Sequence, residues 1–156
     1  MLKLWGRVNS SNVKKVRWTC AELEIPYERI DAGLHFGVNN TPEFKAMNPL
    51  AMIPVIDDDG FVLWESNAIV RYLCSKYPKA PYYPNDLRVR ASADRWMDFQ
   101  QGSMSIALGQ PFMQLIRSPQ AEWDMPMITK GITRSGELWK IVDQRSEEHT
   151  SELQSQ

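Results

Sequence analysis

The sequence of 156 residues lacks several features that would point to particular classes of function. Its two cysteines, Cys20 and Cys74, form no Cys-x-x-Cys pair, so neither a structural zinc site nor a dithiol redox motif is indicated. Both follow valines at helical spacing and are expected in the core. No metal site is therefore predicted.

Long apolar runs and a strong net charge are also absent. No apolar segment approaches the roughly 20 residues of a membrane-spanning helix, and the N-terminus lacks the apolar core of a signal peptide. A cytoplasmic location is therefore expected. The formal net charge of −1 gives no indication of nucleic acid or of an anionic membrane surface as a partner.

The segment from Asn48 to Ile69 is the most informative part of the sequence. A short β-branched run, Ile53–Ile56, is interrupted by Pro54, which cannot donate a hydrogen bond within a sheet. The acidic turn Asp57–Gly60 ends in Asp-Gly, a strong hairpin signal, and Phe61–Trp64 is the expected return strand. Proline at such a position lies at the strand's first residue or in a special bend, including a cis one.

Three polar residues, Glu65, Ser66 and Asn67, open an apolar helix expected to run to about Lys76. A helix N-terminus presents free N–H groups and the positive end of the helix dipole, so it holds carboxylates well. Two interpretations of Ser66 stay open at this point. It is either a simple N-cap or part of a carboxylate pocket.

The rest of the first half supplies a β-α-β unit and a short helix. Leu2–Trp5 and Tyr27–Ile30 are the expected strands, and the helix between them begins near Ser11 and ends near Leu23. Lys14, Lys15 and Arg17 of this helix are expected mainly toward solvent. A short helix follows from Thr41-Pro42, with proline in the first turn. Residues 1–78 therefore predict one α/β domain with the order βαβαββα.

After a proline-rich linker at residues 79–84, the pattern becomes purely helical. Asn85 or Asp86 can cap a long helix, with a kink expected near Pro111. A second helix is expected from about Gln120 to Asp143, weakened near Pro126 and two glycines. Residues 85–144 thus predict a helical domain. Residues 145–156 contain one apolar side chain, Leu153, and are expected to be disordered.

The sequence resembles the cytosolic glutathione transferases over about residues 1–144, in particular bacterial, serine-type or theta-like members. The resemblance rests on the Ser/Asn loop after the first strand, on Asn48-Pro49 followed by Ile53-Pro54, and on the string from Asp59 to Ile69. Arg90-Ala91 and residues 94–98 resemble the bacterial members. The family implies a thioredoxin-like N-terminal domain followed by an all-α C-terminal domain. The helical domain of this sequence is shorter than the resemblance implies, and it is expected to be incomplete.

The resemblance also implies roles for individual residues. It implies a cis Pro54, with the Ile53 backbone pairing with the cysteine backbone of glutathione, and it assigns the γ-glutamyl end to Glu65 and Ser66. Glutathione is then a co-substrate, and no permanently bound cofactor is expected. Ala51 lies where related members often carry a basic or polar residue near the glycine end, so that end is expected to be held differently.

The catalytic candidate implied by the family is Ser10, with Ser11 and Asn12 as alternates. A hydroxyl here donates a hydrogen bond to the glutathione sulfur and favours the nucleophilic thiolate. The competing interpretation is that these three are only loop and cap residues. No tyrosine or cysteine occupies the loop, which argues against the tyrosine-type and cysteine-type members.

Three functions remain compatible with the sequence. The first is a glutathione transferase that conjugates glutathione to small electrophiles, and the family implies a homodimer. The second is a glutathione-dependent reductase, isomerase or dehalogenase on the same fold. The third is a non-catalytic, transferase-like binding module, which would fit a truncated chain.

Overall fold

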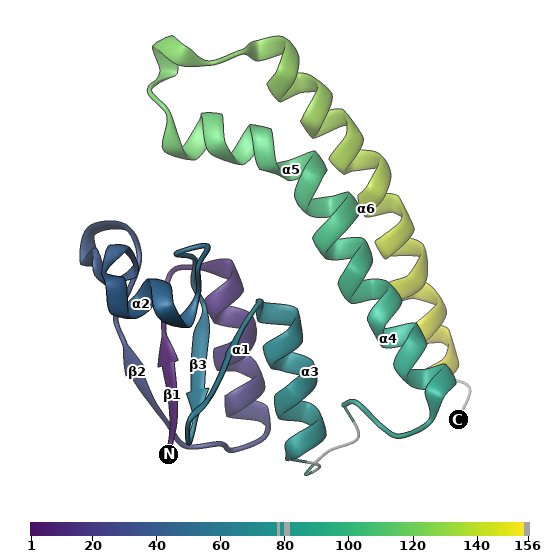
Figure 1. Ribbon diagram of the computed structural model, residues 1–156. Coiled ribbons are helices and arrows are strands. Elements are labelled where there is room, and N and C mark those ends of the chain that lie inside the picture. The colour runs from purple at the N-terminus through teal and green to yellow at the C-terminus, as the bar shows by residue number, and fades with distance from the viewer. Residues whose placement is uncertain (78, 80–81, 155–156) are drawn as a thin grey trace. The chain divides into compact units, whose positions relative to one another are not determined.

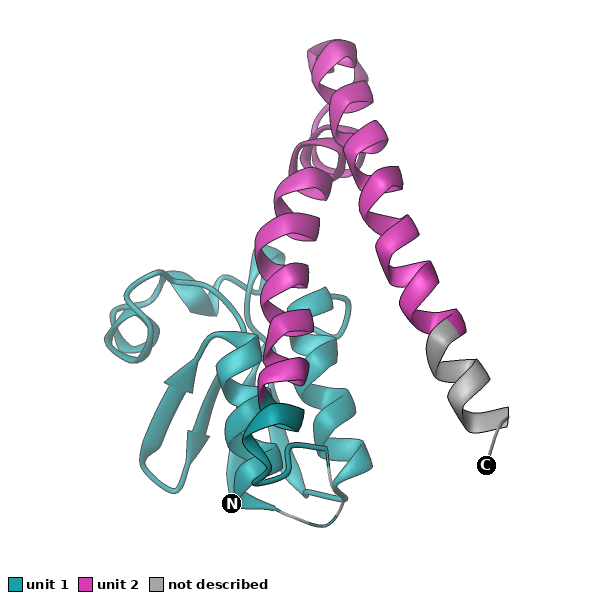
Figure 2. Ribbon diagram, turned by 90° about the vertical axis from the view of Figure 1, so that its right-hand side faces the viewer, with its two compact units in different colours: residues 1–90 teal, residues 91–156 magenta. Residues whose placement is uncertain are grey.

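The computed structural model describes residues 1–77, 79 and 82–154. The chain divides into two compact units, residues 1–90 and residues 91–156, which are coloured separately in Figure 2. Residues 85–90 belong to the first unit. The expected linker at 79–84 and the expected boundary at 78 lie partly outside the described residues, at positions 78, 80 and 81.

The first unit is a four-stranded sheet with helices on both faces (Figure 1). The strands have the order β2-β1-β3-β4, in which β1 and β2 are parallel and the other pairs are antiparallel. The predicted order βαβαββα is confirmed, with two short 3₁₀ turns added before the second helix. The elements are β1 (Leu2–Trp5), α1 (Ser11–Glu22), β2 (Tyr27–Ile30), 3₁₀ turns at Leu34–Phe36 and Val38–Asn40, α2 (Pro42–Met47), β3 (Val55–Asp58), β4 (Phe61–Trp64) and α3 (Ser66–Lys76).

Alternating side chains of the central strands build two layers of core. Leu4 and Ile56 pack with the buried faces of α1 and α3 in one cluster. Val55, the neighbour of Ile56, packs with Phe44 of α2 in the other, with Trp5 against it. Because successive side chains of a strand point to opposite faces, two adjacent residues serve both layers. The two cysteines belong to the first cluster, as the sequence predicts.

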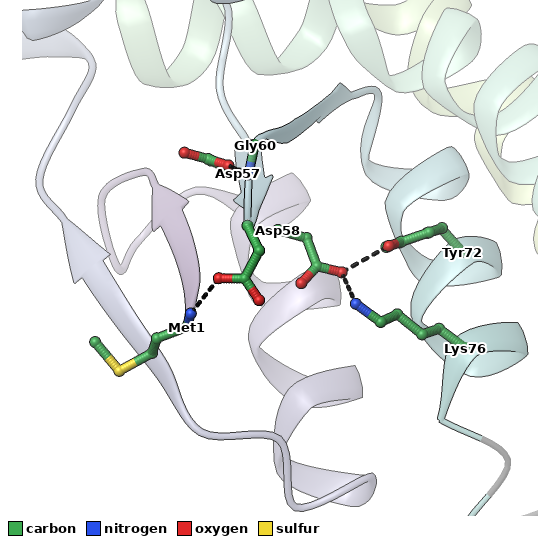
Figure 3. Close-up of polar contacts among 7 residues, drawn as sticks. Met1, Asp57, Asp58, Gly60, Tyr72 and Lys76 are labelled. Atoms are coloured by element: carbon green, nitrogen blue, oxygen red, sulfur yellow. Dashed lines mark hydrogen bonds and ion pairs between the residues drawn. The ribbon is translucent and has the colours of Figure 1, made fainter.

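A buried carboxylate joins β3 to α3. Asp58 accepts hydrogen bonds from the Tyr72 hydroxyl at 2.6 Å and from Lys76 Nζ at 2.5 Å (Figure 3). Its side chain is 2% exposed, against 40% for that of Lys76. Burial alone would raise the pKa of Asp58, but the two hydrogen bonds and the ammonium charge outweigh burial, and the pKa is lowered.

The turn that follows Asp58 has the conformation that its sequence predicts. Asp59 and Gly60 both have positive φ, 52° and 95°, as a tight two-residue hairpin requires. The Gly60 N–H donates to Asp57 Oδ1 at 2.7 Å, and the N-terminal ammonium pairs with Asp59 at 2.5 Å (Figure 3). The turn is thus held by a hydrogen bond to Asp57 and by an ion pair at Asp59.

The second unit consists of helices, apart from short connections. Its described elements are the C-terminal part of α4 (Leu87–Phe99), a π-helical segment at Gln100–Met104, α5 (Ser105–Phe112), a second π-helical segment at Met113–Arg117, a 3₁₀ turn at Gln120–Glu122 and α6 (Met125–Gln154). Asp86 caps α4, since its Oδ1 accepts from the backbone N–H of Arg88 and Val89. Pro111 lies inside α5, so the irregularity expected there takes the form of wider turns before and after that helix.

The last helix differs from the expectation at both ends. It begins at Met125 rather than near Gln120, and it continues through residues 145–154, for which disorder was expected. Once a helix is nucleated, each further residue adds a hydrogen bond, so an existing helix can extend through good helix formers such as glutamate and glutamine. Within the described part of the chain, no helix is both long and apolar enough to cross a membrane.

Candidate ligand site at one edge of the sheet

Strand register brings three separate segments to one edge of the first unit. Trp5, the last residue of β1, lies opposite Val55, the first residue of β3, and Val55 lies opposite Trp64, the last residue of β4. The chain therefore leaves β1 and β4 and enters β3 at the same edge. The segments beyond that edge contain every site residue that the sequence analysis singled out, from Ser10 through Ile53 to Ser66.

Ser10 occupies the N-cap of α1. Its backbone is extended, its carbonyl accepts the first helical hydrogen bond from Lys14, and its Oγ accepts from the Val13 N–H at 3.5 Å. The residue is 9% exposed, whereas Ser11 is exposed and Asn12 is half-buried. A capping hydroxyl uses its oxygen as an acceptor, so its O–H can donate elsewhere. The structure thus places Ser10 as a cap with a remaining donor.

The Ile53–Pro54 peptide bond is cis, as the family resemblance implies. Pro54 is buried and Ile53 half-buried, directly before β3. The loop after β2 lies against Ile53, because a Cβ placed on Gly33 would approach Ile53 Cδ1 to 2.9 Å. Gly33 has φ 89°, a conformation that favours glycine, and a side chain there would also displace the end of the Ile53 side chain.

Two asparagines hold the loop before the cis bond. Asn48, which is 2% exposed, donates from Nδ2 to the Met52 carbonyl at 2.9 Å and accepts the Leu50 N–H at 3.0 Å. Asn39 donates to the Ala51 carbonyl at 2.9 Å. No local sequence pattern assigns a role in ligand binding to either asparagine. The Asn-Pro pair at 48–49 was the available signal, since asparagine commonly bonds to the backbone two residues ahead.

The N-terminus of α3 presents a buried hydroxyl and an exposed carboxylate. Ser66 is 4% exposed, and Glu65 before it is exposed. Glu65 has φ 72° and its side chain does not cap the helix. A positive φ at a non-glycine residue costs about 1–3 kcal/mol and recurs at functional sites. This backbone geometry turns Glu65 out of the helix and leaves the first N–H groups of α3 without a side-chain cap.

Lys15 corrects one expectation from the sequence. It was predicted to point mainly toward solvent, but it is half-buried, and its Nζ lies 3.4 Å from Ser66 Oγ and 3.2 Å from Asn67 Oδ1. Burial lowers the pKa of Lys15, and the charge of Glu65 partly opposes that effect. Helical periodicity could not reveal the contact, because the acceptors come from α3, more than fifty residues later.

The two thiols lie away from this chemistry. Cys20 and Cys74 are buried and unpaired with each other. Burial, with a smaller contribution from Cys74, raises the pKa of Cys20 to about 11, and burial raises that of Cys74. Both are therefore protonated core residues near neutral pH. Within the described residues there is also no group of three or more His, Cys, Asp or Glu side chains that could hold a metal.

Comparison with known proteins agrees with this architecture. Residues 1–75 match the family model described as glutathione S-transferase, N-terminal domain. The chain is 43% identical over 145 residues to glutathione S-transferase GstB of Escherichia coli K12, covering 92% of this chain and 70% of that protein.

Solved structures show the same likeness. The theta class glutathione S-transferase of Xanthomonas axonopodis pv. citri, solved with glutathione bound, superposes with a TM-score of 0.86 at 41% identity, covering 92% of this chain and 69% of that one. Glutathione transferase F2 of Populus trichocarpa gives a TM-score of 0.85 at 27% identity, covering 95% and 71%.

The fold is therefore a thioredoxin-like N-terminal domain followed by a mostly helical C-terminal region, and the predicted fold class is confirmed. The chain belongs to the glutathione S-transferase family.

Proposed function

We propose that the protein is a glutathione transferase that conjugates glutathione to small electrophiles. The observation that carries the proposal is the convergence of Ser10, the cis Ile53–Pro54 bond and the α3 N-terminus at one edge of one sheet. A hydroxyl, an extended backbone segment and a helix N-terminus are the groups needed for a thiol, a peptide backbone and a carboxylate, respectively.

Glutathione binds along this edge in the following way. The backbone of Ile53 pairs with the cysteine backbone of the peptide, and Pro54 holds that segment in place. The γ-glutamyl carboxylate binds at the N-terminus of α3, where Ser66 and the uncapped N–H groups supply donors. The carboxylate of the exposed Glu65 accepts a charge-assisted hydrogen bond from the γ-glutamyl ammonium.

Ser10 acts on the sulfur. Its O–H donates a hydrogen bond to the glutathione sulfur and lowers the pKa of that thiol, so that more thiolate is present near neutral pH. The thiolate forms a C–S bond to the electrophilic carbon, and the leaving group departs with the electron pair. Ser11 and Asn12 are the alternates for this role. Ser11 is exposed and does not share the N-cap position of Ser10.

The test is the substitution Ser10→Ala compared with Ser11→Ala. We expect Ser10→Ala to reduce the rate of conjugation of a chloronitroaromatic substrate by about 10- to 100-fold, because a hydrogen bond to a charged group contributes about 1.5–3 kcal/mol. The pH profile of kcat/KM should shift to higher pH, as the thiolate becomes harder to form. Loss of the cap destabilises α1 by about 1 kcal/mol, so circular dichroism must show a folded variant.

Three outcomes would contradict the Ser10 assignment or the function itself. An unchanged rate and pH profile in Ser10→Ala would remove Ser10 from the mechanism, and Asn12→Ala would then be the next variant. A wild-type chain that is retained on immobilised glutathione but conjugates no electrophile would instead be a binding module. A chain that is not retained at all would overturn the function altogether.

We further propose that the protein acts in the cytoplasm, in detoxification, and as a homodimer. Exposed apolar side chains in the second unit support self-association, among them Ile106, Ile116 and Trp139, which are 79%, 66% and 54% exposed. Sedimentation of the full chain measures the assembly. A monomer at micromolar concentration would contradict the dimer.

A further inference from the structure

We propose that Lys15 is a binding residue for the α-carboxylate of the ligand held at the N-terminus of α3, and that Lys15 together with Glu65 recognises an α-amino-acid head group. This inference rests on the proposed function, because it assigns a residue to one end of the same site. It goes beyond that function by adding a positively charged side chain of α1 to the binding site, which until then consisted of Glu65, Ser66 and the N–H groups of α3.

The hydrogen bonds that Lys15 makes have a fixed direction. An ammonium group only donates, so Ser66 Oγ and Asn67 Oδ1 both act as acceptors toward Lys15 Nζ, at 3.4 Å and 3.2 Å. The Ser66 hydroxyl proton is then free to point elsewhere. A hydroxyl that accepts from a cation is a better donor, so Lys15 prepares Ser66 to donate to an anion.

Charges of both signs lie beside the N-terminus of α3. Lys15 is half-buried on α1, and Glu65 is exposed immediately before α3, close enough for its charge to affect the pKa of Lys15. A positive and a negative side chain beside one helix N-terminus match a zwitterion. The carboxylate binds at Lys15, Ser66 and the helix N–H groups, and the ammonium binds at Glu65.

The contrast between Lys15 and Lys14 separates a binding role from simple packing. Lys14 is the neighbouring lysine on the same helix, but it is exposed and lies on the solvent side. Two adjacent lysines of one helix therefore have different environments. A partly buried ammonium loses hydration, and a charged ligand group restores part of what it loses.

The experiment compares the binding of two peptides to the wild-type chain and to two variants. Calorimetry gives Kd for glutathione and for an analogue that lacks only the α-carboxylate, 4-aminobutyryl-cysteinyl-glycine, with the wild-type chain, Lys15→Met and Lys14→Met. We expect Lys15→Met to raise the Kd for glutathione about 10- to 100-fold, the range for the loss of one hydrogen bond to a charged group. The Kd of the analogue should rise less than about threefold, because the analogue has no α-carboxylate to contact Lys15.

Two further measurements refine the result. A deaminated analogue, glutaryl-cysteinyl-glycine, retains the carboxylate and should lose as much affinity on Lys15→Met as glutathione does. Lys15→Arg keeps the positive charge and should retain more glutathione affinity than Lys15→Met. If Lys15→Met does not fold, Lys15→Gln replaces it, because glutamine is a polar side chain, one bond shorter than lysine, without the charge. Lys14→Met should change none of these affinities.

The outcomes distinguish the inference from the function on which it rests. Equal losses for glutathione and the analogue lacking the carboxylate would show that Lys15 acts only through packing, and the inference would fail while glutathione binding stands. An unchanged Kd in Lys15→Met would also overturn it. If the wild-type chain bound no glutathione, the proposed function would fail as well.

Discussion

At the scale of single residues, the first unit contains several non-glycine positions with positive φ. Ala51, Asp59 and Glu65 have φ of 53°, 52° and 72°. Asp59 belongs to a tight turn, where aspartate is common, and Glu65 precedes the helix at the candidate site. Ala51 has neither explanation, and an asparagine amide holds its carbonyl in place.

We predict that Ala51→Gly stabilises the protein. Removing Cβ relieves the left-handed conformation, which costs about 1–2 kcal/mol, while the more flexible unfolded chain cancels part of the gain. The expected net change is an increase of about 0.5–1 kcal/mol in the free energy of unfolding, measured by urea titration. Ala46→Gly in α2 is the matched control and should decrease it by about 1 kcal/mol. A loss of stability in Ala51→Gly would contradict the prediction.

Which residues could be predicted depended on whether their partners are local. Ser66 was identified from the local pattern of a helix start, and Ser10 from the family resemblance, which rests on short strings of neighbouring residues. Lys15 was assigned to solvent, since its partners lie on α3 and only the folded unit brings the two helices together. Asn39 was missed for the same reason: its amide holds the backbone of a loop twelve residues away.

At the scale of secondary-structure elements, β3 and α3 depend on the buried carboxylate of Asp58. Its partners Tyr72 and Lys76 lie one turn apart on α3, so one residue of the hairpin fixes the position of a helix. The N-terminus of that helix carries the proposed carboxylate site. The orientation of α3 is therefore set at the opposite end from the ligand.

We predict that this carboxylate makes stability depend on acid pH. The pKa of Asp58 is lowered in the folded state, because the bonds from Lys76 and Tyr72 outweigh burial. Its contribution is thus fully present above its unfolded pKa of about 3.9 and is lost as pH falls below that value. Urea unfolding at pH 7, 5 and 3 should show a smaller loss for Asp58→Asn than for the wild-type chain.

The control for this measurement is Asp59→Asn, which makes the same change in net charge at an exposed position of the same turn. If the free energy of unfolding fell equally steeply with decreasing pH in the wild-type chain and in Asp58→Asn, the role of Asp58 would be contradicted. A lower stability of Asp58→Asn at pH 7 is expected in any case, because the substitution leaves Lys76 without its carboxylate partner.

The crossing of α5 and α6 gives a second prediction at this scale. A Cβ on Gly131 would lie 2.5 Å from Pro111 Cγ and 2.7 Å from the Ala107 carbonyl oxygen, so Gly131→Ala should destabilise the second unit by about 1–3 kcal/mol. Gly136 lies on the same helix with nothing within 4 Å, and Gly136→Ala should stabilise by up to about 1 kcal/mol. Thermal unfolding of the two variants, followed by the circular dichroism of their helices, measures the difference. Equal effects would contradict the close contact.

Element types were predicted better than element ends. The strands and helices of the first unit have strong local patterns and turn signals, so their order was predictable from the sequence. The start of α6 was not, because Pro119 and Pro126 permit a helix to begin at either point. Its continuation beyond Asp143 was not expected either, because composition predicts packing better than it predicts helix extension.

At the scale of the whole molecule, the two units differ in the size of their cores. The first contains the large cluster around Leu4 and Ile56 and a second cluster around Phe44. Among the described residues of the second unit, the buried apolar cluster comprises Met104, Ala107 and Leu138. Many of its large apolar side chains are exposed.

We predict that the two units differ in local stability. Segments with few buried contacts open more easily, so amide hydrogens of α5 and α6 should exchange faster than those of β1, β3 and α1. Hydrogen–deuterium exchange followed by mass spectrometry of the full chain measures this difference. Equal protection of α1 and α6 over the same time course would contradict it.

The burial of Cys20 and Cys74 affects how readily the protein is itself alkylated by electrophiles. A protein that brings electrophiles to a thiolate exposes every other nucleophile it carries to the same reagents. Its two thiols are buried and stay protonated at neutral pH, so alkylation is directed to the bound co-substrate rather than to the polypeptide. The catalyst can thus be reused while the peptide thiol is consumed.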